Sequence, residues 1–305
     1  LMKIANRMEN LSPSVTLAIT ALARELKAQG KDILSFSAGE PDFDTPQIVK
    51  DAAIKAINDG QTKYTAVEGI IATKQAIINK LKKDHGLEYK LDGIVISNGA
   101  KHSLFNLFQV LIEKGDEVII PAPYWVTYPE QVKFSDGIPV FIDTDDSTEF
   151  KITPEQLKAV ITPKTKVLLL NTPSNPTGSV YTKEELTALG KVLEGTDILV
   201  FSDEMYEKII YNGTKFTAAA EVSEDMYNRT VTINGLSKAV AMTGWRFGYI
   251  ATPNVALAKA LTKLQGQVTS NVNTMTQYAA IPALEGEADK DIEMMRVEFE
   301  KRKNI

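Results

Sequence analysis

The middle of the chain alternates short apolar runs with amphipathic segments. Unbroken or β-branched apolar runs predict strands, and an apolar stripe at helical spacing predicts helices. The predicted strands are residues 94–97, 117–120, 139–142, 166–170, 198–201, 230–233 and 247–251, and the predicted helices are 101–113, 154–161, 183–193 and 255–264. Pro121 is expected to stop the second strand, and Thr153 before Pro154 is a typical helix start. This order predicts an α/β fold, a mostly parallel central sheet flanked by helices.

The two ends of the chain have a different pattern. Residues 1–44 are less regular and precede the α/β region. Residues 289–304 form a charged, helix-favouring run without a glycine or proline stop signal after it. We therefore expect a helix there and more chain beyond it.

Composition excludes several classes of function. The 305 residues are 44% hydrophobic and 24% charged, as in ordinary globular proteins, and the net charge of −5 argues against a nucleic-acid partner. Without cysteine, disulfides and thiolate sites are excluded, and two histidines, His85 and His102, are too few for a multi-histidine metal site. His85 is expected to be a solvated loop residue, and no metal is expected. No apolar run approaches the ~20 residues that span a bilayer, and no secretory signal is recognisable, so a cytoplasmic location is expected.

Unusual residues follow the predicted strands, where ligands of α/β sheets bind. Residues 98–101, Asn-Gly-Ala-Lys, open a helix, and small residues there let backbone N–H groups approach an anion. Trp125 lies in a proline-flanked loop, where it is either a packed aromatic or a planar face for a ring. Asn175 lies in an Asn-Pro-Thr-Gly run, which is also ordinary turn chemistry. Each signal alone is weak.

Asp203 follows a buried strand, where a carboxylate is costly unless it is paired. A protonated pyridine nitrogen is such a partner, and Tyr206 could reach the phenolic oxygen of the same ring. Lys238 lies between two predicted strands and precedes Arg246 by eight residues. An amine that can form a Schiff base, with a cation for a phosphate, is what pyridoxal phosphate requires. A lysine after a strand is usually a surface charge, so the shared location of these groups carries the hypothesis.

Together these segments resemble fold-type I pyridoxal-phosphate enzymes, specifically the class I/II aminotransferases, and most closely the bacterial aspartate aminotransferases. The resemblance covers essentially the whole chain and rests on Ala-Gly-Glu-Pro-Asp-Phe at 38–43, Thr-Lys-Tyr at 62–64, residues 98–101, Pro-Tyr-Trp at 123–125, residues 171–178, Ser-Asp-Glu-Met-Tyr at 202–206, Ser-Lys at 237–238 and Gly-Trp-Arg at 244–246.

The resemblance implies a role for each residue at the cofactor ring. Lys238 forms the Schiff base and then moves the proton. Asp203 pairs with the ring nitrogen, Tyr206 and Asn175 hydrogen-bond the ring oxygen, and Trp125 stacks on the ring. The resemblance also implies that Gly39, Trp125 and Asn175 contact the substrate.

The phosphate has its own implied set. Arg246 and the backbone of Gly99, Ala100 and Lys101 bind it, and Tyr64 reaches the phosphate of the partner subunit in a homodimer. Two positions depart from the pattern. Many relatives have a serine at the position of Gly235, so Ser237 or backbone groups are expected to replace it. Ser12 stands where some dual-function relatives have a lysine for a second carboxylate, which argues against prephenate.

The resemblance further implies three parts: an N-terminal arm with part of a small domain (1–44), a large cofactor-binding domain (45–285), and the start of a helix (286–305) that leads to an incomplete small domain. In the family, the arginine that clamps the substrate α-carboxylate lies beyond this point, so we expect this chain to hold the cofactor yet turn over poorly.

The implied activity is amino transfer from an L-amino acid, first aspartate, to 2-oxoglutarate by a ping-pong mechanism. The alternatives are another enzyme of the same fold (a β-lyase, a decarboxylase, an aminocyclopropane-type synthase, or an aromatic or prephenate aminotransferase) and a cofactor-binding fragment without turnover. A transcription regulator of this fold would need an N-terminal helix-turn-helix and a basic surface, and neither is present.

Overall fold

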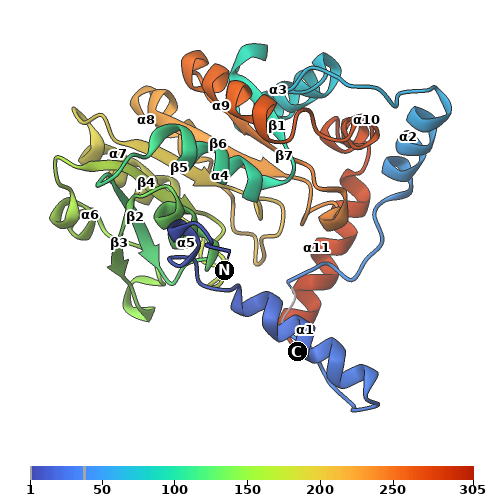
Figure 1. Ribbon diagram of the computed structural model, residues 1–305, viewed down its shortest axis with the longest axis horizontal. Coiled ribbons are helices and arrows are strands. Elements are labelled where there is room, and N and C mark those ends of the chain that lie inside the picture. Colours follow the sequence, from blue (N-terminus) through green and yellow to red (C-terminus); the bar gives the residue numbers. More distant parts are fainter. Residues whose placement is uncertain (1, 37–38) are drawn as a thin grey trace.

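A seven-stranded sheet forms the centre of the protein (Figure 1). A computed structural model describes residues 2–36 and 39–305. The strands are β1 Ile94–Ser97, β2 Glu117–Ala122, β3 Ile138–Asp143, β4 Thr165–Asn171, β5 Leu199–Asp203, β6 Thr230–Gly235 and β7 Gly248–Ala251, in the spatial order β1-β7-β6-β5-β4-β2-β3. Only the pairings of β7 are antiparallel among these seven strands, so the predicted mostly parallel sheet is confirmed.

The predicted stop of strand β2 at Pro121 was wrong. Strand β2 does not stop at Pro121 but continues to Ala122. Its paired residues with β4 end at Ile119, whereas its pairing with β3 continues through Pro121 and Ala122. Proline lacks an N–H donor, so it is tolerated in a sheet where one side of the strand is unpaired.

Helices cover both faces of the sheet. They are α1 Val15–Ala28, α2 Gln47–Asn58, α3 Ile71–His85, α4 Ala100–Leu111, α5 Thr127–Phe134, α6 Pro154–Val160, α7 Lys183–Leu193, α8 Glu224–Arg229, α9 Val255–Val268, α10 Thr274–Leu284 and α11 Asp289–Lys303. The N-cap of α6 is Thr153, which forms the predicted helix start as a capping box with Gln156. The helix predicted in residues 289–304 is α11.

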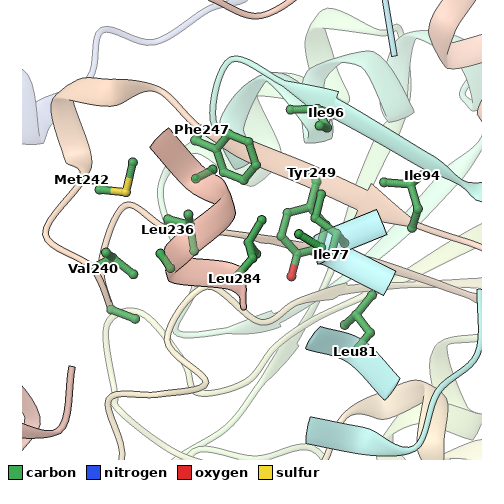
Figure 2. Close-up of a cluster of buried hydrophobic side chains, with 14 of the residues drawn as sticks. Ile77, Leu81, Ile94, Ile96, Leu236, Val240, Met242, Phe247, Tyr249 and Leu284 are labelled. Carbon is green, nitrogen blue, oxygen red and sulfur yellow. The ribbon is translucent and has the colours of Figure 1, made fainter. Parts of the chain in front are cut away.

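The alternation of side chains along the strands divides the core into two sides. Val167 and Leu169 of β4 pack with α4, α5 and α9, whereas Leu168 and Leu170 pack with α6, α7 and α8. Over β1 and β7, the side of the sheet on which Leu168 and Leu170 lie is covered by helices α3 and α10. Figure 2 shows this part of the core, in which Ile77 and Leu81 of α3 lie near Ile94, Phe247 and Tyr249.

The N-terminal region is more regular than predicted. It contains α1, which projects away from the sheet in Figure 1 and has no buried residue in the described part of the chain. Val15, Leu17, Ile19 and Leu22 of this helix are exposed. Its N-cap, Ser14, accepts a hydrogen bond from the Leu17 N–H at 3.4 Å. None of the described helices is both long and apolar enough to cross a membrane.

Candidate active site

A cavity of about 640 Å³ lies at the carboxyl ends of the parallel strands. Strand register brings two of its lining residues together, since Asn171 at the end of β4 is paired with Asp203 at the end of β5. Of the residues predicted for the site, the cavity wall contains Gly39, Ala100, Lys101, Trp125, Asn175, Asp203, Tyr206, Ser237, Lys238 and Arg246. Ala38, which begins one of the motifs, lies outside the described residues.

Lys238 follows the end of β6 and is half-buried, with Nζ donating a hydrogen bond to the carbonyl oxygen of Gly39. Burial lowers the pKa of Lys238 below its ordinary value, the carboxylate of Glu40 opposes this, and the charge of Arg246 adds to the lowering. A lowered pKa increases the neutral fraction of the amine, which is the nucleophilic form.

Asp203 is a buried carboxyl group on the cavity wall, and 4% of it is exposed. Burial raises the pKa of Asp203 to about 6, although hydrogen bonds from the Tyr128 hydroxyl (2.8 Å) and the Met205 N–H (3.3 Å) oppose the rise. Within residues 2–36 and 39–305, no lysine or arginine forms an ion pair with it. A ligand with a cationic N–H would supply the missing partner, and a protonated pyridine ring fits this requirement.

Tyr128 is a site residue that sequence reasoning missed. It lies in α5, a helix that was not predicted, and its side chain is 1% exposed and donates to Asp203. Trp125 packs edge-on against it, with 5.4 Å between ring centroids. The three-residue spacing of two aromatic residues was the only available signal, and it also fits an ordinary packed helix.

Replacing Tyr128 with phenylalanine is expected to raise the pKa of Asp203 above about 6, because a donor to its carboxylate is lost. A hydrogen bond to a charged group contributes about 1.5–3 kcal/mol, so a cationic ligand should bind about 10- to 100-fold more weakly. Carbon NMR of the carboxyl group and a cofactor titration measure the two effects. Tyr124→Phe is the control, because Tyr124 lines the same cavity and stacks on Phe141 instead. An unchanged Asp203 titration would contradict this role.

Asn175 and Tyr206 meet on the same wall. Burial and the Asp203 charge raise the pKa of Tyr206 to about 12, and a hydrogen bond with the Asn175 side chain opposes the rise. Asn171 links the loop after β4 to the end of β5. Its Oδ1 accepts a hydrogen bond from the Asn175 N–H at 2.7 Å, and its Nδ2 donates to the Asp203 carbonyl at 3.0 Å. The amide and phenol hydroxyl thus lie beside the buried carboxyl group.

Another part of the cavity wall is suited to an anion. Arg246 donates to the carbonyls of Thr243 (2.9 Å) and Asn98 (3.3 Å), which holds its guanidinium against the start of α4. Gly99 is the N-cap of α4 with φ +83°, and a Cβ atom there would lie 2.5 Å from Arg246 Nη2. The first N–H groups of a helix have no partner within the helix and attract anions. A phosphate group fits this combination.

Position 235 explains one departure from the expected pattern. A Cβ atom on Gly235 would lie 2.6 Å from the Phe247 carbonyl oxygen, so the close approach of β6 to β7 leaves no room for a serine. Ser237, which is buried and lines the cavity, is the nearby hydroxyl group.

Three predicted residues are placed differently from the rest. Gly99 does not line the cavity, although its neighbours Ala100 and Lys101 do. Tyr64 is 90% exposed and is absent from the cavity wall, so one chain alone does not bring it to the site. Lys101 lines the cavity with its side chain, and its Nζ lies 4.7 Å from the ring centre of Trp125. The prediction had used only the backbone of Lys101.

The comparisons with known proteins agree with this geometry. Residues 31–305 match the model of the family described as aminotransferase class I and II. The chain belongs to this family. It is 53% identical over 304 residues to the aspartate aminotransferase of Geobacillus stearothermophilus, covering 100% of this chain and 77% of that protein. It is 52% identical over 287 residues to the aspartate/prephenate aminotransferase of Nitrosomonas europaea, covering 94% and 72%.

A solved structure gives the same answer for the fold. The aspartate aminotransferase of Thermus thermophilus with maleate matches with a TM-score of 0.96 and 39% identity, covering 100% of this chain and 79% of that one. The chain thus spans about three quarters of the length of the relatives it matches. This class I/II aminotransferase is a transaminase that depends on pyridoxal phosphate, as predicted, and its fold is fold type I.

Proposed function

We propose that this aminotransferase transfers the amino group of L-aspartate to 2-oxoglutarate by a ping-pong mechanism. One observation carries the proposal: Lys238, Asp203 and Arg246 line a single cavity at the strand ends. When bound, pyridoxal phosphate supplies a conjugated ring that takes up the electron pair released at the substrate Cα.

The chain's own residues hold that ring and move the proton. Asp203 pairs with the ring nitrogen, because no lysine or arginine among the described residues forms an ion pair with its buried carboxylate. Tyr206 and Asn175 donate to the ring oxygen, and Trp125 covers the ring face. Lys238 attaches the cofactor and, once released as a neutral amine, takes the proton from the substrate Cα.

The phosphate and the substrate use the remaining groups. Arg246, Ser237 and the backbone of Gly99, Ala100 and Lys101 bind the phosphate. Gly39 lies beside Lys238 and offers its backbone to the substrate carboxylate, next to Trp125 and Asn175.

The charge of the cavity favours a dicarboxylic substrate. Burial and the charge of Arg246 lower the pKa of Lys101. Its ammonium group forms no ion pair with a carboxylate within residues 2–36 and 39–305. Ser14 and Thr16 line the same cavity. With Arg246 used by the phosphate, Lys101 and these hydroxyl groups match the second carboxylate of aspartate.

Replacing Lys101 with methionine should therefore impair the turnover of aspartate more than the turnover of a monocarboxylic amino acid. A charged hydrogen bond contributes about 1.5–3 kcal/mol, so we expect kcat/KM for aspartate to fall about 10- to 100-fold and that for alanine to change little. Steady-state kinetics with both amino acids measure the ratio. Equal losses for the two substrates would contradict a role in reading the second carboxylate.

The function is tested with the purified chain loaded with pyridoxal phosphate. Aspartate is expected to change the visible absorbance and to yield oxaloacetate, and 2-oxoglutarate is expected to restore the spectrum. Release of ammonia or pyruvate would favour a β-lyase. A stronger response to aromatic amino acids or prephenate would favour an aromatic or prephenate aminotransferase. A coloured protein without any response would identify a binding fragment.

The assembly is part of the proposal. The exposed Tyr64 fits a homodimer in which it reaches the phosphate of the partner subunit. Segments 1–44 and 286–305 fit one small domain beside the large domain 45–285, because Arg302 of α11 pairs with Asp42 at 2.9 Å and Phe299 packs on Phe43. The cysteine-free composition is compatible with work in the reducing cytoplasm.

A further inference from the structure

A buried ion network lies behind the active site, on the opposite side of the sheet. Its centre is Glu207, which pairs with Lys80 through Oε1 and with His85 Nε2 at 2.9 Å through Oε2. The side chains of His85 and Glu207 are each 7% exposed. His85 was predicted to be a solvated loop residue, and this was wrong, because it ends α3 and its ring packs against Phe216.

The network joins three separate parts of the chain. His85 Nδ1 lies 3.4 Å from Glu221, in the short helix Ala219–Glu221. Lys80 also lies 3.6 Å from Asp84, which pairs with Lys208 at 2.7 Å. Helix α3, the turn after β5 and the segment at 219–221 are therefore fixed to one another by charge. Tyr249 of β7 faces the same network, and its pKa is raised by burial and by Glu207, Glu204 and Asp84.

The turn after β5 presents different residues to the two sides. Asp203 and Tyr206 face the cavity. Glu204 and Glu207 face the other way, where Glu204 accepts hydrogen bonds from the Ser202 hydroxyl (2.7 Å) and the Ala219 N–H (3.2 Å). The backbone between them is tight, since the Glu207 N–H donates to the Glu204 carbonyl at 3.0 Å. A shift of Glu207 would therefore displace Tyr206 and Asp203.

The charges of this cluster complement one another. Burial alone would lower the pKa of His85, but hydrogen bonds to Glu207 and Glu221 outweigh it and raise the pKa to about 9. Burial would raise the pKa of Glu207, but Lys80 and His85 hold it well below its ordinary range. A buried carboxylate between two cations is strongly held in place, and removing one partner is costly.

We propose that Glu207 and His85 are positioning residues of the transaminase, which hold the turn after β5 from behind so that Asp203 and Tyr206 meet the cofactor ring. The inference rests on the proposed roles of Asp203 and Tyr206. Asp84, His85 and Glu207 also form the one group of potential metal ligands found among the described residues. The ammonium groups of Lys80 and Lys208 already pair with these carboxylates, so the cluster is neutralised without a metal ion.

The test compares Glu207→Gln, which keeps the shape and removes the charge, with the milder His85→Asn. In the cofactor-free protein, we expect amide hydrogen exchange of the 203–207 segment to accelerate at least about tenfold in Glu207→Gln. In the loaded protein, we expect kcat to fall about 10- to 100-fold while KM changes less than about threefold, because a displaced catalytic group slows the chemical step. The pH midpoint of the cofactor absorbance should shift as well. His85→Asn should show the same changes at smaller size.

Asp225→Asn is the matched control. Arg229 pairs with Asp225 at 2.7 Å and donates to the Ile198 carbonyl at 2.7 Å. Because Ile198 directly precedes β5, this pair holds the start of the strand whose end carries Asp203. Loss of this pair should lower the melting temperature without changing kcat or the absorbance midpoint.

The proposal is overturned if Glu207→Gln or His85→Asn lowers only the melting temperature, or if Asp225→Asn shifts kcat and the absorbance midpoint equally. Faster exchange with unchanged kcat and midpoint also overturns it. Failure of the proposed function is distinguishable, because it is seen in the unmodified protein as a missing response to aspartate.

Discussion

Lys238→Ala is expected to abolish covalent attachment of pyridoxal phosphate and nearly all transamination. The structure places no other lysine against Gly39 in the described part of the cavity, and the pKa of Lys238 is lowered by burial. General acid–base catalysis alone contributes about 10²–10⁴-fold, and loss of the nucleophile adds to this. Borohydride treatment followed by mass spectrometry should add the mass of the cofactor to the unmodified protein and not to the variant.

The control for Lys238→Ala is Lys101→Met, which removes the other lysine of the same cavity wall. It should retain the added mass, because the attachment depends on position and not on lysine content. Cofactor mass on the Lys238→Ala protein, or none on Lys101→Met, would place the attachment at a different residue.

The strand ends were predictable because buried parallel strands have a strong sequence pattern. Asp203, Asn175 and Lys238 follow such strands, and the parallel order requires that their loops meet at one edge of the sheet. The predicted strands therefore located most of the cavity wall before any side chain was placed. The complete set of residue roles came from the family resemblance.

Contacts that depend on tertiary packing were not predictable. Tyr128 lies on a short helix whose pattern does not separate it from a loop, so the donor to Asp203 was missed. His85 comes before a glycine in a charged run, which is typical of an exposed turn. Its burial depends on Glu207 and Glu221, which lie more than 100 positions away in the sequence. Local propensity carries no information about such pairs.

Asp203→Asn is expected to stabilise the cofactor-free protein and to weaken cofactor binding and catalysis. Without it, the pKa of Asp203 is raised by burial from 3.8 to about 6. Between pH 3.8 and about pH 6, the folded state therefore binds more protons than the unfolded state. The free energy of unfolding falls as the pH rises through this range, and it stays at the lower value above about pH 6. Asparagine cannot ionise, so at pH 7 the cofactor-free variant should be more stable, by up to about 3 kcal/mol. Thermal melting across pH measures this gain.

With the cofactor, the same substitution removes the charge opposite the ring nitrogen. Truncating one member of a buried charge pair costs about 2–5 kcal/mol, so we expect cofactor affinity and kcat each to fall about 10²–10³-fold. Glu204→Gln is the control, because Glu204 is an equally buried carboxyl group on the next residue and faces away from the cavity, and burial raises its pKa to about 7. Glutamine keeps the oxygen that accepts from Ser202 and Ala219, so Glu204→Gln should change the pH dependence of stability alone. If Asp203→Asn destabilises the cofactor-free protein, or if both variants lose affinity equally, the carboxylate of Asp203 is not the partner of the ring.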